Sequence, residues 1–115
     1  MGYSLGIDLG TTFTAAATAT GDRTDTFSLG NHAATIPSVV FLRDDGDVII
    51  GDVAQRRGQE QPDRIAREFK RRFGDATPIM LGHTPYSAER LMAAVLQLVS
   101  RQVSERNGGP PDAVA

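Results

Sequence analysis

The chain has 115 residues, of which 40% are hydrophobic, so it can form one small domain with a modest core. Its 12 basic and 14 acidic residues give a formal net charge of −2, and this near balance offers no general attraction to nucleic acid or to a membrane surface. Cysteine is absent, which excludes disulfides and thiolate metal sites and favours a cytoplasmic chain. The two histidines, His32 and His83, stand beside Asn and Gly, so we expect them in loops and not as a metal pair. The apolar runs are short, and we expect no signal peptide and no membrane helix within these residues.

The first thirty residues predict a meander of three strands. Residues 3–9 are rich in Leu and Ile, residues 12–20 interleave Thr with Ala, and residues 24–29 resume an alternating pattern. Gly10 separates the first two segments, and Gly-Asp-Arg at 21–23 signals a turn. We therefore expect three strands that pair in chain order.

A second pair of strands is predicted at residues 38–42 and 47–50. The segment between them is Arg-Asp-Asp-Gly, and its Asp-Gly step favours a tight hairpin turn. Pro37 has no N–H to donate, so we expect it at the beginning of the first of these strands.

Two helices are predicted next. The first covers residues 52–57, with Asp52 as its cap. The second covers residues 62–73, because three apolar residues recur there every four positions on one face. These three residues are Ile65, Phe69 and Phe73.

The last part of the chain predicts a hairpin, a long helix and the start of another strand. Residues 74–86 are expected to form a loop with one short hairpin that turns at Gly82 and His83. A helix over residues 87–106 begins at the cap Ser87 and ends at an Asn-Gly-Gly-Pro-Pro sequence. Its apolar stripe consists of Leu91, Val95, Leu98, Val99, Gln102 and Val103. The final Asp-Ala-Val-Ala resembles a strand that is just beginning, so we expect this chain to be part of a longer protein.

The candidate functional site is the sequence Gly-Ile-Asp-Leu-Gly-Thr-Thr at residues 6–12. A Gly-Thr-Thr turn between antiparallel strands directs several backbone N–H groups to one point, because Gly10 has no Cβ to block an approach. Such a concavity binds phosphate. A carboxylate beside phosphate is repulsive unless a cation lies between them, so Asp8 predicts Mg²⁺ held through its water shell. An ordinary hairpin turn with a surface Asp is the alternative for the Asp-Leu-Gly step alone.

Four segments, in order, resemble the heat shock protein 70 family of the actin-like ATPase superfamily. They are GIDLGTT at 6–12, IPSVV at 36–40, GDVA at 51–54 and FKRRFG at 69–74. The resemblance covers residues 3–74 well and the long helix more loosely. It implies an α/β fold, the ribonuclease-H-like mixed sheet with flanking helices, present here as a truncated N-terminal lobe of a nucleotide-binding domain within residues 1–115. The expected parts are a phosphate-hairpin sheet at 1–35, a reduced peripheral subdomain at 36–86, the long helix at 87–106 and the start of the next strand at 107–115.

The resemblance also implies roles for single residues. Asp8 would hold Mg²⁺ through water, and Lys70 would be catalytic, reaching the γ-phosphate of ATP and the attacking water. The residues that line the β- and γ-phosphates would be Gly10, Thr11, Thr12 and Phe13. Without its place in FKRRFG, Lys70 is one of four cations between Arg67 and Arg72, for which a solvated helix face is the alternative.

Three departures from the family pattern limit what is expected of the chain. Phe13 stands where the family commonly has Asn or Tyr, so a polar side-chain contact is lost. The segment 75–86 is shorter than the segment that precedes the long helix in the family, which implies a reduced peripheral subdomain for exchange factors to bind. The chain also ends before the second metal-binding carboxylate, the catalytic glutamate, the second phosphate hairpin and the adenosine pocket. We therefore expect it to be inactive by itself.

The function that the resemblance implies is that of a molecular chaperone. Its parent would bind ATP and ADP in the cytoplasm, and would act on client peptides with co-chaperones in protein folding and the stress response. The alternatives are a bacterial actin-like filament protein, a sugar kinase of the same superfamily and a scaffold without activity. The Gly-Thr-Thr turn and the Lys70 segment argue against a filament protein, and residues 36–42 lack the acid and insert of a sugar kinase. We also expect self-association through apolar side chains that a missing half would cover, for instance Leu91, Val95 and Leu98.

Overall fold

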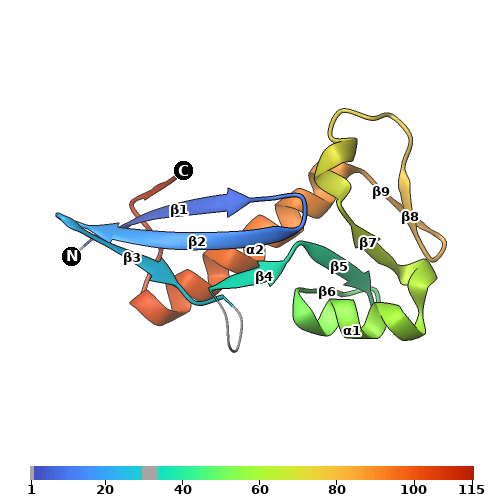
Figure 1. Ribbon diagram of the computed structural model, residues 1–115, viewed down its shortest axis with the longest axis horizontal. Helices are drawn as coiled ribbons and strands as arrows, with labels where there is room; N and C mark the ends of the chain where they lie inside the picture. The colour runs from blue at the N-terminus through green and yellow to red at the C-terminus, as the bar shows by residue number, and fades with distance from the viewer. Residues whose placement is uncertain (1, 30–33) are drawn as a thin grey trace.

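A computed structural model describes residues 2–29 and 34–115, so His32 lies outside the described residues (Figure 1). Within these ranges the strands form a five-stranded sheet, a three-stranded sheet and a two-stranded hairpin, and two α-helices accompany them. The five-stranded sheet is mixed, because one of its strand pairs is parallel and the others are antiparallel. The predicted α/β class with a mixed sheet and flanking helices is confirmed. None of the described helices is at once long enough and apolar enough to span a membrane.

The five-stranded sheet has the order β10-β1-β2-β3, and β4 also pairs with β2. Its strands are β1 (Ser4–Leu9), β2 (Phe13–Thr20), β3 (Arg23–Phe27), β4 (Thr35–Pro37) and β10 (Ala113–Val114). The first three form the predicted meander. The predicted strand near the end of the chain is β10, which lies parallel to β1.

Strand β4 was not predicted, and the expected place of Pro37 is wrong. Pro37 ends β4, where it lies opposite Phe13 of β2, and β5 begins at Val39. Ser38 donates its N–H to the Thr12 carbonyl (2.8 Å), whereas Val39 and the residues after it pair with β6 and β7, so the chain passes from one sheet to the next at Ser38.

The three-stranded sheet has the order β6-β5-β7. Its strands are β5 (Val39–Leu42), β6 (Val48–Ile50) and β7 (Ile65–Arg67). The predicted hairpin between β5 and β6 is present, and Gly46 in its turn has φ of 91°, which glycine adopts readily. The separate hairpin of β8 (Ile79–Leu81) and β9 (Thr84–Tyr86) turns at Gly82 and at the exposed His83, as predicted.

The helix predicted at residues 62–73 is wrong. A short 3-10 turn η1 (Pro62–Arg64) leads into β7, and a second 3-10 turn η2 (Phe69–Arg72) follows. The spacing of apolar residues favours a helix locally, but the free edge of β5 offers a ladder of hydrogen bonds to β7. The predicted apolar face does not form, because Phe69 is buried whereas Phe73 is 64% exposed.

Helix α1 (Asp52–Glu60) is longer than the predicted 52–57, and Asp52 is not its cap. Gly51 occupies the capping position, and no side chain caps the helix there. Helix α1 covers one face of β5, where Val39 and Phe41 pack with Ala54. The other face of β5 packs against α2, so the strand is buried on both sides.

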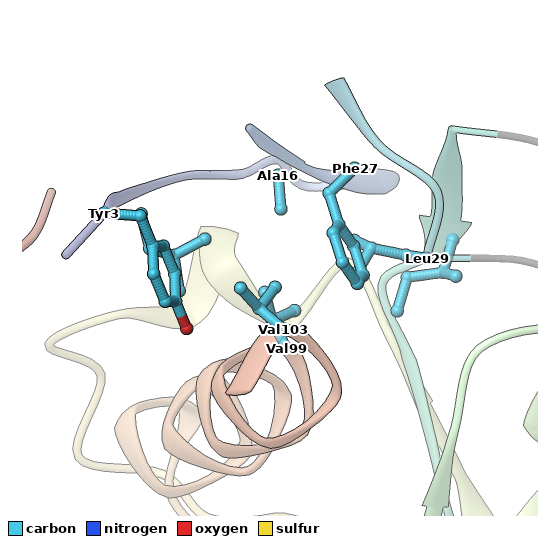
Figure 2. Packing of buried hydrophobic residues seen from close by; sticks show 8 residues of the cluster. Tyr3, Ala16, Phe27, Leu29, Val99 and Val103 are labelled. Atoms are coloured by element: carbon cyan, nitrogen blue, oxygen red, sulfur yellow. The ribbon is translucent and has the colours of Figure 1, made fainter. Parts of the chain in front are cut away.

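Helix α2 (Ala88–Asn107) packs against both the five-stranded and the three-stranded sheet. It begins as predicted, with the Ser87 hydroxyl accepting from Arg90 N–H (3.1 Å), and it ends at Gly108, whose φ is 75°. Its second half contributes to the first core cluster, which consists of Tyr3, Leu5, Ala16, Phe27, Leu29, Ile36, Val99 and Val103. Figure 2 shows side chains of the sheet directed at the helix in this cluster. Its first half contributes to the second core cluster, which consists of Val40, Leu42, Ala66, Phe69, Leu81, Tyr86, Leu91 and Val95.

The second cluster corrects the expectation that Leu91 and Val95 lie on an open face. Leu91 is 1% exposed and Val95 is fully buried, because the three-stranded sheet and the β8–β9 hairpin cover this side of α2. Leu98 is partly buried against the first cluster.

Candidate functional site

The turn between β1 and β2 depends on a glycine at its first position. Gly10 N–H donates to the Phe13 carbonyl (3.0 Å) and brings the two strands together. A Cβ on Gly10 would lie 2.5 Å from that carbonyl oxygen, which belongs to the backbone and cannot rotate away. The chain can therefore make this close approach only with glycine.

The buried hydroxyl groups of Ser38 and Thr14 form hydrogen bonds next to this turn. The Ser38 hydroxyl donates to the Gly10 carbonyl (2.9 Å) and lies 2.8 Å from the Thr14 hydroxyl. Ser38 is 2% exposed and Thr14 is fully buried. Sequence reasoning assigned no role to either residue, although a serine inside the apolar run IPSVVFL was a usable signal.

A groove of about 280 Å³ opens beside the turn. Its wall consists of Thr11, Thr12, Phe13, Pro37, Ser38, Val39, Gln55, Arg67 and Glu68. Small-molecule pockets usually measure about 300–1,000 Å³, so the groove suits a phosphate group or a short phosphate chain better than a whole nucleotide. Three of the four predicted phosphate-binding residues, Thr11, Thr12 and Phe13, are thus brought to one place.

Arg67 and Glu68 reach the groove through an unusual backbone conformation. Glu68 has φ of 52° and ψ of 28°, a left-handed conformation that residues other than glycine adopt rarely. It separates the end of β7 from η2. The Glu68 carboxylate lies 3.6 Å from the Arg71 guanidinium, whereas Arg67 forms no ion pair within the described residues. The groove therefore contains an unpaired cation that the sequence reasoning did not single out.

The predicted magnesium residue and the predicted catalytic residue lie outside the wall of the groove. Asp8 is exposed in β1 opposite Ala15, and it pairs with no cation in the part of the chain that is described. Lys70 is exposed on η2 and is likewise unpaired there. A free carboxylate oxygen fits a water-mediated contact with Mg²⁺, which prefers oxygen ligands and keeps several waters. The described residues contain no group of three or more His, Asp or Glu that could hold a metal by themselves.

Comparison with known families shows which family the chain belongs to. The model of the family described as Hsp70 protein matches residues 4–81, which is more than half of the chain. The chain belongs to the Hsp70 family. The matched range contains all four segments that carried the resemblance, so the predicted membership is confirmed.

Individual Hsp70 relatives extend the match toward the end of the chain. Two proteins named Chaperone protein DnaK, from strains R1 and NRC-1 of Halobacterium salinarum, are each 32% identical to it over 105 residues. The match covers 90% of this chain and 16% of each relative. The chain thus spans about a sixth of the length of these relatives, and the similarity does not favour a filament protein or a sugar kinase.

Proposed function

We propose that this Hsp70-family chain supplies the first phosphate-binding turn of an ATP-hydrolysing chaperone. The observation that carries the proposal is the groove that Thr11, Thr12 and Phe13 line together with Arg67, which forms no ion pair among the described residues. Backbone N–H groups at a glycine turn, together with a guanidinium, are the donors that phosphate oxygens require.

In this proposal Gly10, Thr11, Thr12 and Phe13 bind the β- and γ-phosphates of ATP. Asp8 holds Mg²⁺ through water, and the ion, when bound, neutralises phosphate charge. Lys70 is the catalytic cation for the γ-phosphate. Its exposure on η2, directly after the groove residues, supports this role because a long unpaired side chain is free to turn toward a ligand.

The wider function is proposed from the family and from its relatives, which are named as chaperones. We propose that the whole protein acts in the cytoplasm on client peptides with co-chaperones, in protein folding and the stress response. Its ATP and ADP states would bias a second part of the protein, as differential phosphate contacts can do. The division of the chain at residues 35, 86 and 106 remains part of this proposal.

Titration calorimetry of ATP, with and without Mg²⁺, into the protein as its gene encodes it tests the site. We expect saturable binding that is weakened by Asp8→Asn only when Mg²⁺ is present. Where ATP is hydrolysed, Lys70→Ala should lower the single-turnover rate about 100-fold or more while ATP still binds, since its charge acts on the transferring phosphoryl group. Arg71→Ala is the matched control, because Arg71 is already paired with Glu68. If the unmodified protein does not bind ATP, the proposal is rejected.

Self-association also remains a proposal, with a different surface from the one first expected. Among the described residues, the large apolar side chains that are exposed are Phe13, Val53, Phe73, Met80, Leu96 and Val114. Sedimentation velocity should show a mass that rises with concentration and falls in a Phe73→Ser, Met80→Ser double variant. A constant monomer mass over a wide concentration range would contradict it.

A further inference from the structure

We propose that Ser38 is a positioning residue that opens the turn between β1 and β2 and makes its amide groups available to phosphate. The inference deepens the proposed function and depends on it, because an open turn matters only if an anion binds there. Its basis is the set of three hydrogen bonds that connect Ser38 with Gly10, Thr12 and Thr14.

The turn between β1 and β2 lacks the hydrogen bond that closes an ordinary two-residue turn. In a closed two-residue turn the carbonyl of the first residue accepts from the N–H of the fourth. Here the Gly10 carbonyl accepts from the Ser38 hydroxyl at 2.9 Å, and among the described residues the Phe13 N–H forms no bond to that carbonyl. The hydroxyl of Ser38 thus takes the place of the Phe13 amide.

Peptide geometry fixes the direction of two amide groups of the turn. Ser38 N–H donates to the Thr12 carbonyl (2.8 Å), so Ser38 engages the carbonyls of both Gly10 and Thr12. In a trans peptide the C=O and the following N–H lie in one plane and point in opposite directions. The N–H groups of Thr11 and Phe13, which share those two planes, are therefore turned away from Ser38.

Strand β4 does not accept a hydrogen bond from the Phe13 amide. Hydrogen-bonded and non-hydrogen-bonded residue pairs alternate along an antiparallel ladder. Because Thr12 and Ser38 form a hydrogen-bonded pair, the next pair, Phe13 and Pro37, is a non-hydrogen-bonded one. The Phe13 N–H therefore has no partner on β4 and is left for a ligand at the turn itself.

Thr14 holds Ser38 in the orientation that this role requires. A serine hydroxyl has one proton to donate, and that of Ser38 goes to Gly10, so the Thr14 hydroxyl must be the donor in the contact of 2.8 Å between them. Both side chains are buried, so these bonds are shielded from solvent. If the Ser38 hydroxyl is removed, the Gly10 carbonyl loses its partner, and we expect the Phe13 N–H, the usual donor in a closed turn, to replace it.

Hydrogen exchange and ligand titration of Ser38→Ala test this inference in the protein as encoded. We expect the Phe13 amide to exchange with solvent more slowly in the variant, because the turn closes. A purely structural role would have the opposite effect, since a destabilised turn exchanges faster. Affinity for ATP and for inorganic triphosphate should fall about tenfold, the loss of one charge-assisted hydrogen bond. Ser4→Ala, an exposed serine of β1, is the matched control and should change neither measurement.

The outcomes separate the inference from the proposed function. If the unmodified protein binds neither ATP nor triphosphate, the phosphate site itself is rejected. If it binds them and Ser38→Ala binds equally well, or its Phe13 amide exchanges faster, the role of Ser38 is rejected. Should Ser38→Ala fail to fold, Ser38→Cys preserves the volume and weakens the donor, and unchanged affinity in that variant rejects the role as well.

Discussion

Gly10 is the residue at which a single added carbon has the largest expected effect on the turn. We expect Gly10→Ala to lower the free energy of unfolding by about 1–3 kcal/mol, the usual range for an overpacked site, because the new Cβ would lie against the Phe13 carbonyl. Urea denaturation followed by circular dichroism measures this change. Gly6→Ala in the same strand is the control, since its Cβ would meet only the Ala17 carbonyl oxygen at 3.9 Å. Equal stabilities of the two variants would contradict the argument.

Arg67 is the groove residue that tests the electrostatic part of the site. Arg67→Gln removes the unpaired guanidinium and should weaken triphosphate binding about five- to tenfold at low salt, with a smaller effect at high salt because ions screen exposed charges. Thermal stability should not change, as Arg67 is exposed and forms no ion pair within the described residues. Arg56→Gln on α1 is the control, an exposed arginine that does not line the groove. A loss that is the same for both variants would mean that only net charge matters.

At the scale of elements, α2 should be the helix whose buried face contributes most to stability. Leu91→Ala removes a side chain that is 1% exposed in the second cluster, and we expect a loss of about 2–5 kcal/mol in the free energy of unfolding. The control is Leu96→Ala, the same chemical change at a position that is 37% exposed. Denaturant unfolding of both variants makes the comparison, and similar losses would mean that α2 is not packed as described.

The segment from η1 to η2 shows how an element depends on its neighbours. Ile65, Phe69 and Phe73 do recur every four positions. Only Phe69 is fully buried, however, and Ile65 belongs to strand β7. The sequence of residues 62–73 does not indicate that one edge of β5 is available for pairing. A strand of three residues has little intrinsic preference of its own, so pairing with that edge decides its conformation.

At the scale of the whole molecule, α2 should make the two core clusters unfold together. The chain is elongated, 46 × 29 × 23 Å, yet one helix contributes side chains to both clusters. The protein has no tryptophan and two tyrosines, with Tyr3 in the first cluster and Tyr86 in the second. We expect Tyr3→Phe and Tyr86→Phe each to leave one tyrosine whose fluorescence midpoint equals the circular dichroism midpoint of the same variant. Two separate midpoints would mean that the clusters are independent.

The sequence by itself determined the features that depend on neighbouring residues. Alternation and turn residues indicated the β1–β3 meander and both hairpins, and Ser87 and Gly108 marked the ends of α2, because caps and turns act within a few positions. The order of four short segments indicated the Hsp70 family, which the comparisons confirmed. The roles of Asp8 and the turn residues were argued from the chemistry of the turn and from that resemblance, the role of Lys70 from the resemblance alone, and all of them remain predictions.

Only the tertiary structure decided which distant residues meet. It brought Ser38 and Thr14 together next to the turn between β1 and β2 and placed Arg67 in the wall of the groove. It also buried Leu91 and Val95. These contacts depend on strand pairing and on burial between segments far apart in the chain, and such terms leave no periodic trace in the local sequence. The sequence shows which residues carry a hydroxyl group, but only the tertiary structure determines which group that hydroxyl binds.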